Sequence, residues 1–338
     1  MQVKISQASN MITTLIKAKL VPMVHGSPAV GKSAIGHQIA KDYGLKLIDM
    51  RLSQCDPTDL LGFPFVKEGR AGYAPMENFP LEQDKVPAGF NGWLLFLDEL
   101  NSASQAVQAA SYKLILDRMV GGHKLHPKVA IIAAGNLESD NAIVQPMSTA
   151  LQSRLVHVEL VADAQEWIKW AAGNDVDYRI TSFIEFKPSQ LYTFQADHTD
   201  KTYASPRTWE FADRIMKTVS DVTSKESLAL LSGTLSEGVA REFLAFCKIH
   251  EELPSINEIV SNPEKIKVPN EPSILYALTG SIGSNADNKN IASLLKFINR
   301  MPAEFQVVTL REAIRRNKAL MAEPAMQEWI NKSANSLF

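Results

Sequence analysis

The sequence predicts an α/β protein in which a parallel five-stranded sheet is covered by helices on both faces and followed by an α-helical region. Three observations lead to this fold. Short apolar runs alternate with helical patterns through the first 160 residues, a glycine-rich sequence joins the first run to the first long helix, and strand signals fade after residue 161. We therefore expect an α/β core over residues 1–160 and a helical domain over residues 161–338.

The 338-residue chain has the composition of a globular protein of about two domains. Hydrophobic residues make up 45% and charged residues 21%, which supplies a core and excludes disorder as the main state. The net charge of −2 provides no basic field of the kind that accompanies nucleic-acid binding. Cys55 and Cys247 lie far apart without metal-ligand spacing, so we expect a reduced, cytoplasmic protein. We expect no signal peptide and no membrane span, because the sequence contains no long uncharged apolar run.

Each element of the core follows from its apolar pattern. A short amphipathic helix is expected over about residues 5–16, where apolar residues recur at helical spacing. Five strands are expected over residues 21–25, 45–51, 93–97, 128–134 and 155–160. Longer helices are expected over 32–43 and 105–119, and a short one just before Arg154.

Residues 56–90 interrupt this alternation. Prolines and glycines punctuate the segment, which favours turns and loops. Two short runs, 63–66 and 71–74, could pair across the turn between them, giving an exposed hairpin that carries Phe63, Phe65 and Tyr73. Exposed aromatic side chains without a partner would be unusual, although these could instead pack beneath a long loop.

A phosphate-binding loop is predicted between the first strand and the helix that follows it. The sequence fits the pattern GxxxxGK[ST] and comprises Gly26, Ser27, Pro28, Ala29, Val30, Gly31, Lys32 and Ser33. The glycines let backbone N–H groups surround phosphate oxygens at the N-terminus of the helix. Lys32 would reach the β and γ phosphates and Ser33 would be a magnesium ligand, so we expect a bound nucleoside triphosphate.

Two adjacent carboxylates, Asp98 and Glu99, end the apolar strand over residues 93–97. A buried strand that ends in two acids calls for a function, because buried charge is costly. In a phosphate-loop protein Asp98 would hold Mg²⁺, directly or through water, and Glu99 would activate the attacking water as general base. The alternative is that both acids merely cap the next helix.

A polar amide, Asn136, ends the strand over residues 128–134. If this strand lies between the strand of the phosphate loop and the strand of Asp98, Asn136 reaches the sheet edge where nucleotides bind. There it could position the attacking water. The alternative is a simple turn built by Gly135 and Asn136.

Together these motifs resemble AAA+ ATPases, and their local sequences are most similar to the MoxR-like, dynein-related branch of the P-loop NTPases. Further matches are residues 97–101, 134–136, 153–155 and 205–209, so that the resemblance covers about residues 20–215. It implies that Asn136 is the sensor 1 residue, that Arg154 is an arginine finger for a neighbouring subunit, and that Arg207 is sensor 2 on a helical lid. A solvated surface arginine is the alternative for each of Arg154 and Arg207, with Arg179 and Arg214 as substitutes.

The resemblance also implies an ATP- and Mg²⁺-dependent, ring-forming ATPase, expected as a hexamer, that remodels a protein partner in a chaperone-like role. The insertion over 56–90 would face the pore or the substrate. Two positions depart from the family pattern, since Leu137 replaces a frequent proline and Ser102 a frequent arginine.

Two other functions stay open at the level of sequence. One is a nucleic-acid-linked motor or restriction-type NTPase, for which a basic cluster near the C-terminus could bind phosphate, although such a cluster is more often a solvated helix face. That cluster consists of Arg311, Arg315, Arg316 and Lys318. The other is a nucleotide-gated scaffold that barely hydrolyses ATP, which Glu99 and Arg154 disfavour.

Overall fold

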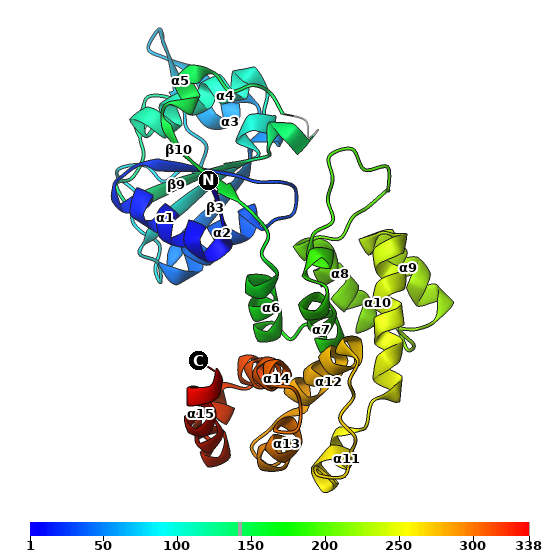
Figure 1. The fold of residues 1–338 in the computed structure, drawn as a ribbon. Coiled ribbons are helices and arrows are strands. Elements are labelled where there is room, and N and C mark those ends of the chain that lie inside the picture. Colours follow the sequence, from blue (N-terminus) through cyan, green and yellow to red (C-terminus); the bar gives the residue numbers. More distant parts are fainter. Residues whose placement is uncertain (141–143, 338) are drawn as a thin grey trace. The chain divides into compact units, whose positions relative to one another are not determined.

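The computed structural model describes residues 1–140 and 144–337, with side chains through residue 332 (Figure 1). The chain divides into two compact units. The first contains Met1–Ala162 with the short segment Gln195–Asp197, and the second contains Asp163–Phe194 and the residues from His198 onward. Among the described residues, no helix has the length and apolar character needed to cross a bilayer.

A parallel sheet forms the centre of the first unit, with the strand order β1-β10-β2-β9-β6-β3. Its strands are β1 (Gln2–Val3), β2 (Val21–His25), β3 (Leu45–Arg51), β6 (Gly92–Asp98), β9 (Val129–Gly135) and β10 (Leu155–Leu160). The five predicted strands are present, and β1 adds a sixth, two-residue strand at one edge that the sequence pattern did not indicate. Because all the strands run in parallel, their carboxyl ends meet at one edge of the sheet.

Helices cover both faces of this sheet. Figure 1 shows α1 (Ile5–Lys17) and α2 (Lys32–Asp42) on one face and α4 (Gln105–Tyr112) and α5 (Thr149–Gln152) on the other. The strands β6 and β9 are almost entirely buried between them, as their continuous apolar sequence requires. This part of the structure confirms the predicted fold class.

The helix predicted over residues 105–119 is shorter than expected. The α-helix ends at Tyr112, a π-helical turn follows over Lys113–Asp117, and Met119–Val120 then forms β7, which pairs with β8 (His123–Lys124). Arg118 adopts a left-handed conformation with φ of 54°. A right-handed helix cannot continue through such a residue, so the chain turns into the small hairpin.

The insertion forms the predicted hairpin. After α3 (Pro57–Leu61), the strands β4 (Phe63–Lys67) and β5 (Arg70–Ala74) pair in antiparallel register. Gly62 starts the hairpin with φ of 94°, and an added Cβ there would lie 2.4 Å from the carbonyl oxygen of Ala74. The side chains of Phe63, Phe65 and Tyr73 are exposed, so they do not pack beneath a loop.

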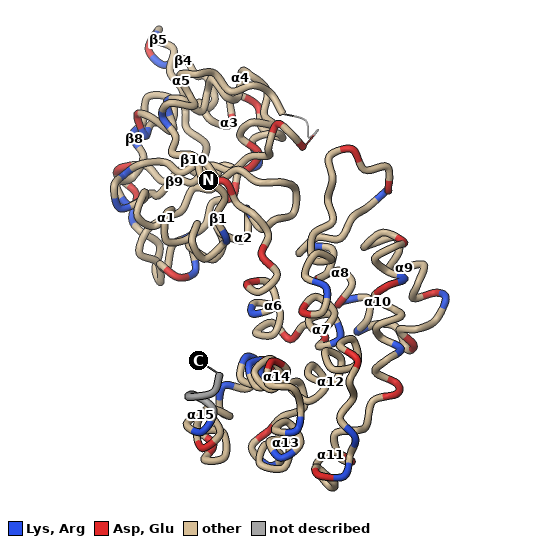
Figure 2. Tube along the Cα trace, in the orientation of Figure 1, with Lys and Arg blue, Asp and Glu red and all other residues tan. Residues whose placement is uncertain are grey.

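The second unit is α-helical among the residues that the structure describes. Its helices are α6 (Ala164–Gly173), α7 (Tyr178–Phe186), α8 (Pro206–Met216), α9 (Lys225–Leu235), α10 (Glu237–Ile249), α11 (Ile256–Ser261), α12 (Pro272–Asn285), α13 (Ile291–Ile298), α14 (Ala303–Arg316) and α15 (Pro324–Leu337). Its aromatic core centres on Phe183, which contacts the rings of Trp209 and Phe243. Figure 2 shows acidic and basic residues interspersed within each unit, with no continuous basic stripe along the described chain.

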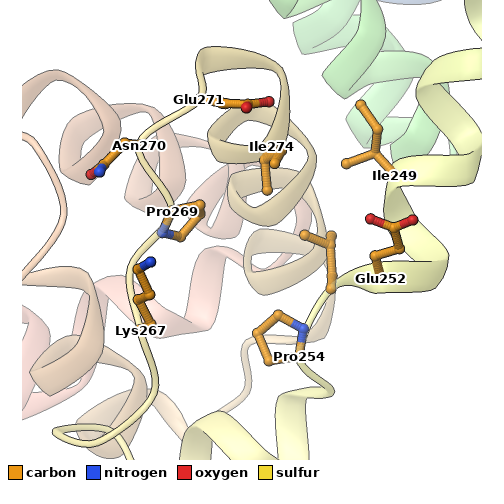
Figure 3. Close-up of a pocket in the computed structure, with 9 residues that line it drawn as sticks. Ile249, Glu252, Pro254, Lys267, Pro269, Asn270, Glu271 and Ile274 are labelled. Carbon is orange, nitrogen blue, oxygen red and sulfur yellow. The ribbon is translucent and has the colours of Figure 1, made fainter.

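The helical unit contains a hollow of about 430 Å³. Figure 3 shows the residues that line it. It lies between the end of α10, the segment over 267–271 and the first turns of α12. Its lining mixes apolar side chains such as Ile249 and Ile274 with the charged side chains of Glu252, Lys267 and Glu271. None of the residues predicted to bind nucleotide lines this hollow.

Candidate active site

The predicted phosphate loop joins β2 to α2 at the carboxyl edge of the sheet. Ala29 and Gly31 have φ of 62° and 106°, left-handed values that bend the loop back over the start of the helix. At Gly26 an added Cβ would lie 2.9 Å from the carbonyl oxygen of Leu160, so a side chain does not fit there. The loop thus directs the first turn of α2 toward the sheet edge, where free helix N–H groups attract phosphate.

The structure brings together Lys32 and Asn136. The Lys32 Nζ donates hydrogen bonds to the carbonyl oxygens of Gly26 (2.6 Å) and Ser27 (3.0 Å) and to the Asn136 Oδ1 (3.0 Å). The contact arises because β9 lies between β2 and β6, the condition under which Asn136 was predicted to reach this edge. Asn136 therefore does more than form a turn.

Ser33 and Asp98 form the second contact of the site. The Ser33 Oγ donates to the Asp98 Oδ2 (3.0 Å), and the backbone N–H of Glu99 donates to the Asp98 Oδ1 (2.9 Å). Asp98 is only 7% exposed, and no ion pair of its carboxylate is found among the described residues. A buried carboxylate without a cation is costly. Together with a serine hydroxyl it fits Mg²⁺, which takes few protein oxygens and completes its shell with water and phosphate.

Glu99 occupies a strained position at the start of a short 3₁₀ turn. Its φ is 57°, a left-handed value that is uncommon for a residue with a side chain and often marks a functional site. Its Oε2 accepts a hydrogen bond from the Ser53 Oγ, and the Arg51 Nε lies 3.8 Å from its Oε1. The general base predicted from the sequence is thus held by two side chains at the end of β3.

Arg51 and Ser53 were missed in the sequence. Their place depends on the register in which β3 pairs with β6, which sets Arg51 directly opposite Asp98. Asp49, on the same strand, has a pKa that is shifted by the charged groups of this site. Burial raises its pKa, the Asp98 carboxylate raises it further, and His37 and Arg51 act in the opposite direction.

A pair of histidines lies beside the phosphate loop. The His25 Nε2 and the His157 Nδ1 are 2.7 Å apart, and the His157 Nε2 donates to the carbonyl oxygen of Gln152 (2.9 Å). Burial lowers the pKa of His25, and the nearby His157 and Lys32 lower it further. The backbone of Asn136 and the carboxylate of Glu159 raise the pKa, but their effect is smaller. His25 therefore favours the neutral form at neutral pH.

Arg154 and Arg207 are the two arginines predicted as site residues from the family resemblance. Arg154 follows α5, is exposed, and donates a hydrogen bond to the carbonyl oxygen of Ala150. Arg207 is an exposed residue of the first turn of α8 in the helical unit, where Ser205 and Thr208 form a capping box. Their assignments as arginine finger and sensor 2 stay predictions.

Comparison with known proteins finds a family model that matches the first unit. Residues 22–160 match the family model described as the ATPase family associated with various cellular activities (AAA). Among solved structures, a RuvB single-site mutant from Thermotoga maritima is 16% identical, with 82% of this chain and 80% of that one covered and a TM-score of 0.39. A proposed ATPase from Cytophaga hutchinsonii is 12% identical over 98% of this chain and 88% of its own, with a TM-score of 0.35. The chain thus carries an AAA ATPase family domain over residues 22–160.

Proposed function

We propose that this protein is an Mg²⁺-dependent AAA+ ATPase of the MoxR-like branch that forms a ring and remodels a protein partner in the cytoplasm. The observation that carries the proposal is the meeting of Lys32, Asn136, Ser33, Asp98 and Glu99 at the carboxyl ends of three neighbouring strands. A scaffold that only binds nucleotide would not need Glu99 held in this strained and polar setting.

The residues divide the chemistry of phosphoryl transfer among them. The phosphate loop binds the β and γ phosphates, and the Lys32 amine exchanges its contacts with loop carbonyls for phosphate oxygens. Ser33 and Asp98 would hold Mg²⁺, whose charge neutralises the phosphates. Glu99 accepts the proton of the attacking water, and Asn136 orients that water beside Lys32.

The ring is proposed from the resemblance to AAA+ ATPases, in which an arginine of a neighbouring subunit stabilises the transferred phosphoryl group. Arg154 is exposed after α5, so it is available to a neighbouring subunit in a hexamer, and Arg207 would complete the site from the lid. Fixed cations of this kind stabilise the charge that develops in the transition state.

The exposed hairpin β4–β5 is the proposed contact with the protein partner. Phe63 and Tyr73 are 63% and 45% exposed, and Val66 is 77% exposed near the turn. Apolar side chains gathered on one exposed element mark a binding surface for protein.

A nucleic-acid motor is less well supported, because two arginines of the basic cluster near the C-terminus form close ion pairs within the helical unit. Arg316 pairs with Glu312 at 2.7 Å, and Arg311 pairs with Glu185. The side chains of Arg315 and Arg316 are only 15% and 12% exposed, so the expectation of a solvated helix face is wrong for these two residues. Their charge serves packing within the helical unit.

The test is ATP turnover and solution mass of the full chain and three variants. Wild type should hydrolyse ATP with Mg²⁺, and Lys32→Ala should abolish ATP binding. Glu99→Gln should bind ATP, lose turnover by about 100-fold or more, and accumulate as a ring of about six chains. Arg154→Ala should bind ATP without hydrolysis and regain turnover when mixed with Lys32→Ala. Turnover that survives Glu99→Gln would contradict the assignment of the base, and an ATP-bound monomer would contradict the ring.

A further inference from the structure

The backbone of Asn136 is held by a second asparagine, Asn101, which follows the two acids of β6. The Asn101 Nδ2 donates to the carbonyl oxygen of Asn136 (2.8 Å), and the backbone N–H of Asn136 donates to the Asn101 Oδ1 (3.0 Å). Both polar ends of one side chain amide thus pair with both polar groups of one backbone residue. No hydroxyl, carboxylate or aliphatic side chain can make both bonds, because only an amide has a donor and an acceptor side by side.

The side chain that makes this pair is itself fixed. Asn101 is 2% exposed and sits in the 3₁₀ turn Leu100–Ser102, directly after Glu99. Its carbonyl oxygen accepts a hydrogen bond from the backbone N–H of Gln145 (2.7 Å). Since a buried amide that loses its partners is destabilised, the Asn101 side chain has one favourable position.

The neighbouring glycine shows how closely the two residues approach. A Cβ added at Gly135 would lie 2.2 Å from the Asn101 Oδ1, closer than any side chain can tolerate. Glycine at this position is therefore needed for the amide to reach the backbone of Asn136. The end of β9 and the turn after β6 therefore lie in direct contact through Gly135 and Asn101.

We propose that Asn101 is a positioning residue that fixes the Asn136 side chain against Lys32 and so couples the turn carrying Glu99 to the γ-phosphate side of the site. The inference rests on the proposed ATPase function. The described hydrogen bonds of Asn101 include none to a predicted phosphate-binding residue, and its effect passes through Asn136, whose Oδ1 accepts from the Lys32 Nζ. Small displacements of an orienting group reduce catalysis far more than they reduce substrate binding.

Two substitutions of Asn101 separate the role of the amide from the effect of charge. Asn101→Asp keeps the acceptor and loses the donor, and Asn101→Leu removes both without adding charge. We expect each variant to lower kcat for ATP by about 10-fold to 100-fold while KM changes by about 3-fold or less. Asn91→Asp is the matched control, since its Nδ2 donates to the carbonyl of Tyr43 on the surface of the same unit, and it should leave kcat unchanged.

A double-substitution cycle tests whether Asn101 acts through Asn136. In an Asn136→Ala background, Asn101→Leu should cause no further loss of kcat, because the side chain that it positions is already absent. Additive losses would overturn the proposal, and so would a defect confined to Asn101→Asp, which would indicate charge alone. If the Asn101 variants fail to fold, Gly135→Ala approaches the same contact from β9 and should reproduce the loss of kcat.

The failure of this proposal is distinct from the failure of the ATPase function. Wild type without turnover would contradict the ATPase, whereas an active wild type with fully active Asn101 variants would contradict the positioning role. If wild type has no turnover, the contact between Asn101 and Asn136 is tested by measuring the affinity for ATPγS relative to the affinity for ADP. Asn101→Leu and Asn136→Ala should then reduce that preference equally, and unequal effects would overturn the proposal.

Discussion

Two buried carboxylates, Asp98 in the α/β unit and Glu312 in the helical unit, show how the same chemical group serves different ends. Each is 7% exposed. The Glu312 Oε1 accepts a hydrogen bond from the Arg316 Nε at 2.7 Å, and the Arg315 Nη1 lies 4.0 Å from the Glu312 Oε2. Asp98 is hydrogen bonded only by a hydroxyl and a backbone N–H among its described contacts. The carboxylate of Glu312 is neutralised by an arginine and has a structural role. The carboxylate of Asp98 has no such cation among its described contacts, which suits a residue that binds a cationic ligand.

The surroundings of each carboxylate extend this contrast. Arg316 also donates to the carbonyl oxygen of Val176 and to the Thr181 Oγ1, each at 3.1 Å. The arginine that pairs with Glu312 is therefore itself held by neighbouring groups of the helical unit. Near Asp98 another acid, Asp49, has its pKa raised by burial and by Asp98 itself. Asp49 and Asp98 thus lie near each other at the sheet edge, whereas the carboxylate of Glu312 is paired with an arginine.

The largest expected effect is that of Asp98→Asn on catalysis. Loss of the carboxylate should reduce Mg²⁺-dependent ATP turnover by roughly 10²-fold to 10⁴-fold, because the cation loses the charged one of its two proposed protein ligands. The free energy of unfolding should stay constant or rise, since an uncompensated buried charge is removed. Turnover and urea denaturation measure the two quantities. A clear loss of stability would show that Asp98 is structural, like Glu312.

Glu312→Gln should have the opposite profile. It leaves the guanidinium of Arg316 buried without its counter-ion, which should lower the free energy of unfolding of the helical unit by about 3 kcal/mol or more. Affinity for ATP should not change. Urea denaturation and nucleotide titration check both expectations, with Glu237→Gln as control, because its ion pair with Arg241 is exposed. An unaltered midpoint for Glu312→Gln would contradict the structural role.

A third effect concerns His250, a histidine in the helical core. Burial lowers its pKa from 6.5 to about 4, with further lowering by Arg179, and its ring nitrogens have no hydrogen-bond partner among the described residues. The unfolded chain therefore takes up a proton first as the pH falls. Stability from this group is complete above about pH 6.5 and is lost between pH 6.5 and 4, by about 3 kcal/mol in total.

His250→Phe is the variant that isolates this effect. The phenyl ring can keep the edge contacts with Tyr178 and Phe246 but cannot be protonated. We expect its free energy of unfolding to fall less steeply than that of wild type between pH 6.5 and 4. Parallel curves for the two proteins would assign the acid sensitivity to other groups.

The smallest expected effect is that of Ser53→Ala on Glu99. Loss of one hydrogen bond to the carboxylate should lower kcat by about 5-fold, close to 1 kcal/mol, with little change in KM. Ser102→Ala is the control, because the Ser102 hydroxyl is buried without a hydrogen-bond partner among the described residues. Steady-state kinetics of both variants measures the difference. Equal losses would indicate disturbed packing near Glu99 instead of a lost hydrogen bond.

Most of the first unit could be predicted from its sequence because its strands are continuous apolar runs and its loop has a fixed glycine spacing. The order of Lys32, Asp98 and Asn136 along the chain was sufficient to place them at one sheet edge once β9 was assumed to lie between β2 and β6. The π-helical turn after Tyr112 gave no signal, because its residues continue the helical pattern of α4.

The partners of the site residues could not be predicted, since they depend on register between strands. Arg51 contacts Glu99 only because β3 pairs with β6 in a register that sets Arg51 opposite Asp98. The pairing of Arg316 with Glu312 lies within one helix and could have been read from the four-residue spacing. That spacing suits a surface as well as a core, so the burial of the pair was invisible in the sequence.

The two-residue strand β1 has a consequence for how the first unit is made. It pairs with β10, and the Gln2 Nε2 donates to the Glu159 Oε1 across 157 residues of sequence. β2 also lies between β10 and β9, so both of its neighbours in the sheet come much later in the chain than β2 itself. Such distant pairing slows folding and leaves strand edges exposed in the nascent chain. The sheet can close only after β10, which ends at Leu160, has been synthesised, and until then β2 lacks one of its two neighbouring strands.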